Sequence, residues 1–207
     1  MTGKTHMGIG LLTAVVILDK QALGISPLSI LICIFASLLP DADHPKGVFN
    51  KYILPMRNKA VKLTIYLSLG ITIIGINYLY FSYTYLYALG LVVILIGVSA
   101  HRQGITHSLL GFILCVYIVG YATEGLEVIE RERFNISFIA GFGTHILADL
   151  FTNRGVPLFY PFSKRKFKMP LTFRVGSGVG NLIEGIIIAI GIIYLTFKIP
   201  MMVINMN

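Results

Sequence analysis

Three short polar motifs interrupt the long apolar stretches of this chain, and each of them carries histidine or aspartate. The motifs are LLPDADHP, RQGITHS and GTHILADLF, in that order along the sequence. Imidazole and carboxylate groups together bind divalent ions of intermediate hardness, such as Zn²⁺, Mn²⁺ and Fe²⁺. The candidate metal ligands in these motifs are Asp41, Asp43, His44, His107, His145 and Asp149.

The spacing within the motifs indicates hydrolysis by metal-activated water. Asp41 and Asp43 are separated by one residue, so they can bridge or flank two ions, and paired ions both activate water and stabilise a leaving oxygen. Either aspartate can also serve as a general base. Arg102 carries a planar guanidinium whose geometry suits a phosphate oxygen. The expected catalytic residues are Asp41, Asp43, Arg102 and Thr106.

The composition places these motifs in a membrane protein. Hydrophobic residues make up 56% of the 207 residues and charged residues only 13%, whereas a soluble domain carries about 25% charged residues. Several apolar stretches approach the roughly 20 residues that span a bilayer. Cys33 and Cys115 lie within such stretches and are expected to be small buried hydrophobes. We therefore expect an all-α, polytopic integral membrane bundle that forms a single domain over residues 1–207.

Seven apolar segments are expected to form the helices of this bundle. Two N-terminal segments of 12 residues each precede five longer ones. Because 12 residues are few for a full span, the first two are expected to form a tight pair or re-entrant segments. The expected helices cover Met7–Leu18, Leu28–Leu39, Lys62–Phe81, Tyr85–Ala100, Ile105–Ala122, Asn135–Phe151 and Val179–Phe197.

Positive charge is distributed unevenly between the two ends of these segments. If the chain crosses or reverses at each segment, 13 of the 17 Lys and Arg residues share the side of the N-terminus, which the positive-inside rule assigns to the cytoplasm. All five histidines and three of the four aspartates fall on that side. We therefore expect the ligands to converge at the cytoplasmic face of a multi-pass protein in a bacterial-type inner membrane. Basic loops beside membrane helices indicate anionic lipid, not nucleic acid, as the partner, and the cations from Lys164 to Arg174 are expected to attract its headgroup.

Each motif also has a simpler structural explanation. His145 and Asp149 are four residues apart on one side of a helix and could bond only to each other. The aspartates of LLPDADHP could cap a turn between its prolines, and Thr106 or Ser108 could cap the helix after RQGITHS. Taken together, the polar groups favour a site, because an ionisable group inside a membrane costs about 2.5–3.5 kcal/mol near a helix centre and is rarely kept without a partner or a function.

The ordered motifs resemble the YdjM-type family of inner-membrane, metal-dependent hydrolases. A TH pair near the start, LLPDADHP, RQGITHSLL, GTHILADLFTNRGVPLFYPF and GNLIE cover most of the chain. One departure concerns His101, which stands six residues before His107, where the family has five. The HILAD spacing is also similar to that of helical zinc phospholipases C and P1-type nucleases. The metal ligands that the family resemblance implies are His6, Asp41, Asp43, His44, His107, His145, Asp149 and Glu184.

Two other functions would use the same residues. A metal or proton transporter usually holds its site near the membrane midplane on broken helices, whereas the candidate ligands here lie at one face. A metal-stabilised membrane scaffold that binds a protein partner would hold a coordinatively closed site. We expect instead a membrane-bound hydrolase that acts at the cytoplasmic interface on a lipid phosphoester or phosphoanhydride. It would use two or more divalent ions, most simply Zn²⁺, with Mn²⁺ or Fe²⁺ as alternatives.

Overall fold

The computed structural model of the chain describes residues 1–48, 50–99 and 104–204. Within these residues the regular structure is helical, apart from one isolated bridge between Thr152 and Phe173, which confirms the expected all-α class. The helices of twelve or more residues are α1 (Gly3–Lys20), α2 (Pro27–Leu38), α4 (Lys59–Ile76), α5 (Thr84–Val98), α6 (Leu109–Ala122), α7 (Val128–Leu150) and α8 (Gly178–Ile204). The shorter elements are the 3-10 helix η1 (Leu39–Asp43), α3 (Asn50–Ile53), the π-helical turn η2 (Asn77–Phe81) and the 3-10 helix η3 (Ile105–His107).

Two helical segments in the described part of the chain are long and apolar enough to cross a membrane. They are Lys59–Phe81, which comprises α4 and η2, and Gly178–Met202, which comprises most of α8. Helices α5 and α6 are apolar but shorter. The polytopic arrangement with five long apolar helices therefore stays a prediction.

The chain divides into two compact units, which we describe separately. The four-helix unit holds α1, α2, α7 and α8 within Met1–Leu38, Thr123–Gly155 and the described part of Phe167–Asn207. The three-helix unit holds α4, α5 and α6, together with the short elements, within the described part of Leu39–Ala122 and within Val156–Lys166. Whether residues 1–207 act as a single domain stays a prediction.

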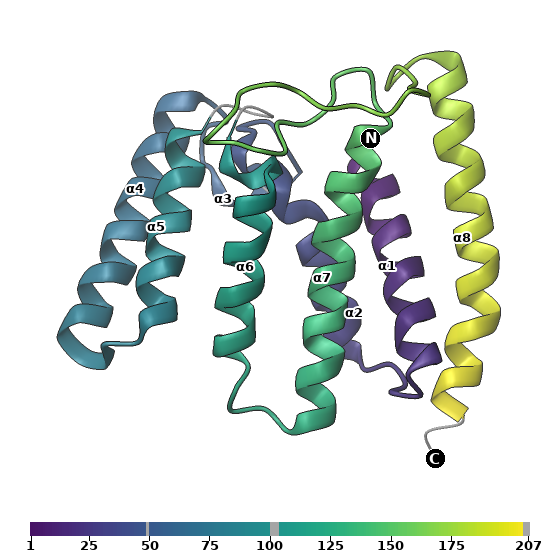
Figure 1. Cartoon of the computed structure of the whole chain (residues 1–207), viewed down its shortest axis with the longest axis horizontal. Coiled ribbons are helices and arrows are strands. Elements are labelled where there is room, and N and C mark those ends of the chain that lie inside the picture. The colour runs from purple at the N-terminus through teal and green to yellow at the C-terminus, as the bar shows by residue number, and fades with distance from the viewer. Residues whose placement is uncertain (49, 100–103, 205–207) are drawn as a thin grey trace. The chain divides into compact units, whose positions relative to one another are not determined.

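Small residues let α1, α2 and α7 approach closely in the four-helix unit (Figure 1). A Cβ atom added to Gly10 of α1 would lie 2.3 Å from a side-chain oxygen of α2, and one added to Gly141 of α7 would lie 2.4 Å from a backbone carbonyl oxygen of α2. Larger side chains at either position would push the helices apart. Because His6 is one turn before Gly10 and His145 is one turn after Gly141, this close packing brings the two imidazoles together.

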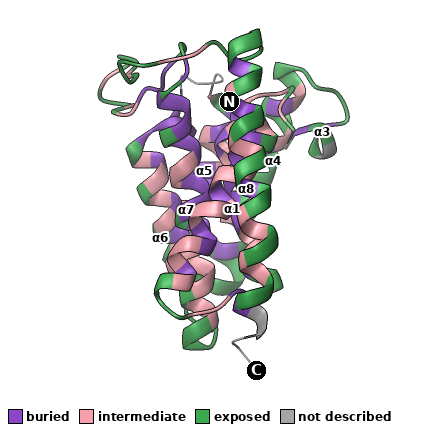
Figure 2. Ribbon diagram, turned by 90° about the vertical axis from the view of Figure 1, so that its right-hand side faces the viewer, coloured by how far each residue is buried: buried purple, intermediate pink, exposed green. Residues whose placement is uncertain are grey.

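Helix α8 contributes an outer wall to the four-helix unit. It packs against α1, and exposed or partly exposed residues follow most of its length (Figure 2). Its outward side chains are large and apolar, as at Leu182, Ile186 and Ile193. Such a surface is stable against lipid chains and would be costly in water.

Close contact between glycines also joins α4 and α5 in the three-helix unit. A Cβ atom on Gly70 would lie 2.7 Å from the Gly90 carbonyl oxygen, and one on Gly90 would lie 3.0 Å from the Gly70 carbonyl oxygen. At the end of this helix pair, Asn77 Nδ2 donates to the Tyr83 carbonyl, while Asn77 Oδ1 accepts from the Tyr83 amide. The apolar hairpin is therefore closed without leaving the polar groups of its turn unsatisfied.

Two expected helices have different limits in the structure. Helix α7 begins at Val128, seven residues before the expected start at Asn135, because the Glu127 side chain caps it by accepting from the Glu130 amide. The charged first turn of α7 is helical although it breaks the apolar pattern. Apolar length alone therefore underestimates a helix whose first turn is charged.

The expected helix Ile105–Ala122 is interrupted. Ser108 Oγ accepts from the Gly111 amide, so α6 begins only at Leu109, and the preceding residues form η3. Of the two expected caps, Ser108 is therefore the one that the structure uses. Thr106 is left to make a different contact.

The N-terminal pair also differs in length from the expected segments. Helix α1 covers 18 residues in place of the expected 12, because four residues from Gly3 to His6 precede the apolar run and Asp19 and Lys20 follow it within the same helix. Helix α2 keeps 12 residues and is followed at once by η1. The aspartates of LLPDADHP thus lie on a separate 3-10 turn that directly follows α2 in the chain.

We expect Gly141→Ala to destabilise the four-helix unit. The new Cβ would collide with the Cys33 carbonyl oxygen, and overpacking of this kind costs about 1–3 kcal/mol. Gly185→Ala in α8 is the matched control, since nothing lies within 4 Å of its Cβ position and alanine favours a helix by up to about 1 kcal/mol. Thermal unfolding in detergent should show a lower midpoint for Gly141→Ala only. Equal midpoints would contradict the close packing of α2 and α7.

Candidate metal centre

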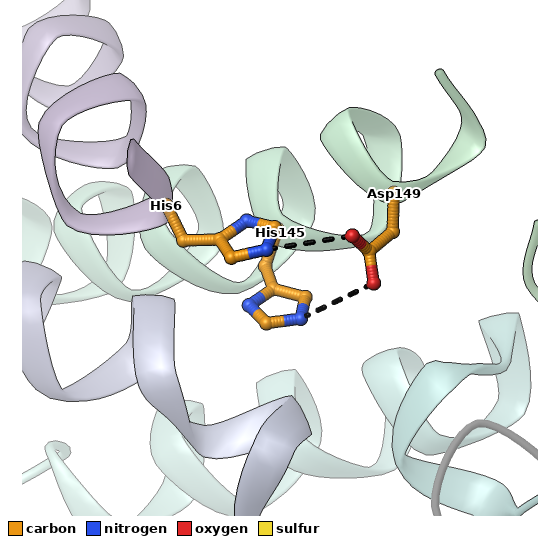
Figure 3. Close-up of side chains that lie close together, drawn as sticks. All are labelled: His6, His145 and Asp149. Atoms are coloured by element: carbon orange, nitrogen blue, oxygen red, sulfur yellow. Dashed lines mark ion pairs between the residues drawn. The ribbon is translucent and has the colours of Figure 1, made fainter. Parts of the chain in front are cut away.

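Three buried side chains meet in the four-helix unit, one from α1 and two from α7 (Figure 3). His6 Nε2 lies 3.4 Å from Asp149 Oδ1, and His145 Nε2 lies 3.8 Å from Asp149 Oδ2. The two imidazole rings stack, with centroids 3.7 Å apart and planes inclined by 12°. One ligand atom from each residue lies within 4.8 Å of the other two. We call His6, His145 and Asp149 the metal centre.

The dimensions of the metal centre suit a small divalent ion. Ligand bonds of Zn²⁺ to nitrogen and oxygen are about 2.0–2.2 Å long, so two ligands of a tetrahedral ion lie about 3.3–3.6 Å apart. The two separations from Asp149, 3.4 Å to His6 and 3.8 Å to His145, are close to this value. Two imidazoles with one carboxylate also form a donor set that Zn²⁺, Mn²⁺ and Fe²⁺ accept. The residues therefore fit the expected ion.

A backbone contact sets the tautomer of His145. Its Nδ1 lies 2.7 Å from the Ser37 carbonyl oxygen, which can only accept, so Nδ1 carries the proton. In the neutral ring, Nε2 is then unprotonated and faces Asp149. Metal-binding histidines commonly have this arrangement, in which one ring nitrogen donates to a carbonyl and the other ligates. Ser37 is itself held by a bond from its Oγ to the Cys33 carbonyl.

Asp149 is fully buried and is surrounded by donors. The amino group of Met1 donates to its Oδ1 at 2.6 Å, and the imidazole of His6 approaches the same oxygen. A buried carboxylate is stable only when such groups offset its desolvation. The metal centre therefore keeps an ionised carboxylate between two imidazoles.

Glu184 lies next to the metal centre but is not one of its three grouped residues. Its Oε2 accepts from the Thr2 amide at 3.0 Å, from Thr2 Oγ1 at 2.6 Å and from Thr5 Oγ1 at 2.5 Å. Glu184 thereby ties α8 to the first turn of α1, directly before His6. Glu184 therefore helps to position His6. Its role as a metal ligand, which the family resemblance implies, stays a prediction.

A second polar cluster forms in the three-helix unit, where η1 meets η3. His107 Nε2 lies 3.7 Å from Asp41 Oδ1, and His107 Nδ1 lies 3.6 Å from Asp43 Oδ2. Asp43 and His107 are fully buried, while the side chain of Asp41 is 21% exposed. We call Asp41, Asp43, Thr106 and His107 the aspartate cluster. The structure thus brings together residues 41, 43, 106 and 107, and their role as a site stays a prediction.

Thr106 links two members of the aspartate cluster. Its hydroxyl donates to Asp43 Oδ2 at 2.9 Å and lies 3.2 Å from His107 Nδ1. Because the single hydroxyl proton points to Asp43, the oxygen accepts from Nδ1–H of His107. The neutral ring then has an unprotonated Nε2 on the side of Asp41, as His145 has on the side of Asp149. This role for Thr106 differs from the expected catalytic one, which nothing in the structure tests.

Two further predicted site residues have other positions. His44 lies half-buried after η1, and its Nδ1 accepts from the Lys46 amide at 3.0 Å, so that nitrogen is already engaged within its own turn. His44 is not in the group of ligand atoms around His107 in the described residues. Arg102, the expected phosphate-binding residue, lies outside the described residues, as does His101.

A buried lysine supports the aspartate cluster and was not predicted from the sequence. Lys62 Nζ donates to the carbonyls of Asp43 at 2.9 Å, Ile96 at 2.9 Å and Ser99 at 2.6 Å. The ammonium group thus uses all three protons and lies at the carbonyl end of α5, where a cation is stabilised by the helix dipole. The sequence offers no signal for this role, because its acceptors are backbone atoms.

Asn50 was also missed, and it holds the same turn from the other side. Its Nδ2 donates to the carbonyls of Ala42 at 2.7 Å and His44 at 2.8 Å, while its Oδ1 accepts from Tyr66 Oη at 2.8 Å. Asn50 therefore ties η1 to α4. A lone asparagine in a polar loop gives no indication of such a role.

Each unit thus gathers one group of the predicted ligands: the metal centre in the four-helix unit and the aspartate cluster in the three-helix unit. The union of both groups into a single layer around shared ions stays a prediction.

Comparisons with known proteins agree with the motifs. A protein-family model described as YdjM inner membrane protein matches residues 1–205, which is nearly the whole chain. Searches of curated proteins and of solved structures gave no match.

We expect Thr106→Ala to weaken Zn²⁺ binding by the aspartate cluster about 10- to 100-fold, because it removes the group that orients His107. Thr106→Ser keeps a hydroxyl and is the matched control. Both are measured by competition with a chromophoric chelator in a His6→Ala background, which removes a ligand that belongs to the metal centre only. Equal affinities for all three proteins would mean that Thr106 does not orient the ligand.

Proposed function

The chain belongs to the YdjM inner membrane protein family, and on this premise we propose that it is a membrane-embedded, metal-dependent hydrolase of a phosphorylated lipid. The observation that carries the proposal is the fixed tautomer of His145. With Nδ1 bound to the Ser37 carbonyl, its Nε2 is directed at Asp149 beside His6, so His145 is oriented as a ligand before any ion binds. Orientation of this kind is typical of metal sites, and a simple His–Asp ion pair does not require it.

The number of grouped ligands supports a catalytic site over a structural one. Catalytic zinc sites commonly have three protein ligands and keep one position for water or substrate, whereas structural sites are closed by four. The metal centre offers one carboxylate and two imidazoles. When bound there, a divalent ion would lower the pKa of water to about 7 and so supply a nucleophile at neutral pH. Zn²⁺ is the ion that we propose first, with Mn²⁺ or Fe²⁺ as alternatives.

The residues of the aspartate cluster are candidates for a second ion and for proton transfer. Asp41 retains 21% exposure and can exchange a proton with water, whereas Asp43 is fully buried and accepts from Thr106. We therefore assign the general base to Asp41. In the hydrolysis, oxygen from water bonds to phosphorus, the bond from phosphorus to the leaving oxygen breaks, and the base accepts the proton of the water.

Charge and apolar surface together support a lipid substrate. The segment between α7 and α8 carries six cations, and Arg154, Lys168 and Arg174 among them are exposed in the four-helix unit. Such residues attract anionic headgroups at a membrane surface. The positive-inside rule places this segment, and with it the site, on the cytoplasmic side of a multi-pass protein.

The test combines metal analysis with hydrolysis of phospholipids, phosphatidate and prenyl pyrophosphates by protein purified in detergent. We expect wild type to retain divalent metal and to release phosphate or a phosphorylated headgroup from at least one lipid. His145→Ala should lose the ion of the metal centre and Asp41→Ala the ion of the aspartate cluster, and both should lose activity, because each removes a proposed ligand. Ser137→Ala is the matched control: its hydroxyl is buried in α7 and makes no hydrogen bond to any residue that the structure describes, so its loss should change neither.

Other outcomes would favour the alternatives. Tightly bound metal without hydrolysis of any phosphorylated lipid would contradict the proposal and favour a metal-stabilised scaffold. Metal-dependent ion flux into liposomes that carry the protein, abolished by His145→Ala, would favour transport.

A further inference from the structure

An apolar groove of about 560 Å³ adjoins the metal centre in the four-helix unit. Its lining includes Met1, whose amino group donates to Asp149, and Ala148, the residue before Asp149. From there the groove follows α7 and α8. Its apolar walls include Ile9, Leu147, Phe151, Leu171, Ile183 and Ile187.

We infer that this groove binds the hydrocarbon chain of a phosphorylated membrane lipid whose phosphoryl group lies at the metal centre. The inference rests on the proposed function and deepens it, because it assigns the part of the substrate that does not react. The class of ligand is an anionic amphiphile with a long apolar chain, acyl or prenyl.

The chemistry of the walls supports a hydrocarbon occupant. Thr144, a polar residue on the α7 wall, donates from its Oγ1 to the Ala140 carbonyl at 2.6 Å and so is satisfied within its own helix. The six apolar lining residues given above have aliphatic or aromatic side chains. Three of them, Leu147, Phe151 and Leu171, are substantially exposed. A volume of this size lies within the range of sites that enclose a small organic ligand.

Charge at the rim selects an anionic lipid among apolar ligands. Leu171, Thr172 and Phe173 line the groove, and the same segment carries Lys168 before them and Arg174 after them, both exposed. A strip of apolar side chains bracketed by cations matches the boundary between lipid chain and anionic headgroup. A neutral lipid would not use these charges.

The position of the groove along α8 agrees with access from the bilayer. Ile183 and Ile187 are one turn apart in the first turns of the segment Gly178–Met202, which is long and apolar enough to span a membrane. A lipid already in the membrane could therefore place its chain against α8 without leaving the apolar phase. Little energy is then spent on desolvating the chain.

Tryptophan fluorescence tests the inference directly, since the chain has no natural tryptophan. Phe173→Trp places a conservative reporter in the groove, and Leu182→Trp places one on the exposed surface of α8 outside it. Each protein is reconstituted in phosphatidylcholine nanodiscs with increasing small fractions of phosphatidate whose chains are brominated. We expect saturable quenching of the groove reporter and quenching of the control reporter that only grows in proportion to the brominated fraction.

Competition and a second pair of variants make the test specific. Unlabelled phosphatidate or polyprenyl phosphate should reverse the saturable quenching, whereas glycerol phosphate, which lacks a chain, should not. Ile187→Phe in the reporter protein fills the groove and should abolish saturation, while Ile186→Phe, on the neighbouring exposed position, should not. Linear quenching of both reporters would overturn the inference, as would a groove reporter shielded from lipid in every preparation, which would indicate cover by a second copy of the chain.

Hydrolysis measurements separate failure of the groove from failure of the proposed function. In an active enzyme, Ile187→Phe should lower kcat/KM for a long-chain phosphorylated lipid about tenfold or more and leave kcat/KM for p-nitrophenyl phosphate and the metal content unchanged. Saturable quenching without hydrolysis would keep the groove and reject the hydrolase. Hydrolysis of both substrates that Ile187→Phe does not alter would reject the groove and keep the hydrolase.

Discussion

The hydrogen bond between His145 Nδ1 and the Ser37 carbonyl is the contact on which the metal centre depends. It can form only because Gly141 lets α7 approach the backbone of α2, where any larger side chain would collide with a carbonyl oxygen. The bond then fixes both the tilt of the imidazole and the nitrogen that is left to face Asp149. Helix packing, tautomer and ligand geometry are thus consequences of one close approach between two helices.

Each unit contains a buried charged residue that holds a ligand-bearing turn in place, and the two charges have opposite signs. A polar group buried in an apolar bundle must find hydrogen-bond partners, and each unit uses a buried charge to hold a turn that carries ligands. In the four-helix unit, Glu184 binds Thr2 and Thr5 in the turn that presents His6. In the three-helix unit, Lys62 binds the carbonyl of Asp43 in the turn that presents the aspartates. Each charge is stabilised by neighbouring polar groups, and in return it restricts the position of a ligand.

The sequence predicted contacts that follow from local spacing and missed those that depend on backbone atoms. His145 and Asp149 were expected to share one side of a helix, and they do, because four residues make about one turn. Thr106 was expected either to cap a helix or to act in catalysis, and its bond to Asp43 could not be foreseen from residues 63 positions apart. Ser37 accepts from His145 through its backbone carbonyl, and Lys62 donates to the backbone carbonyls of other residues. Because every residue has a backbone carbonyl, the residue type gives no signal of such contacts. The apolar pattern located the helices, but charged first turns such as that of α7 shifted their ends.

The ligands lie near the ends of their helices, and this position supports the proposed hydrolase over a transporter. His6 lies in the first turn of α1, and Asp149 is the second-last residue of α7, so the metal centre is at one end of the four-helix unit. From Met7 to Leu18 and from Gly185 to Phe197, α1 and α8 carry no charged residue that could pass an ion onward. A charged species that reached the centre would therefore meet an apolar barrier, whereas a lipid could leave its chain beside α8 and present only its headgroup. The position of the metal centre at one end of the unit is therefore consistent with the proposed substrate, which belongs to both phases.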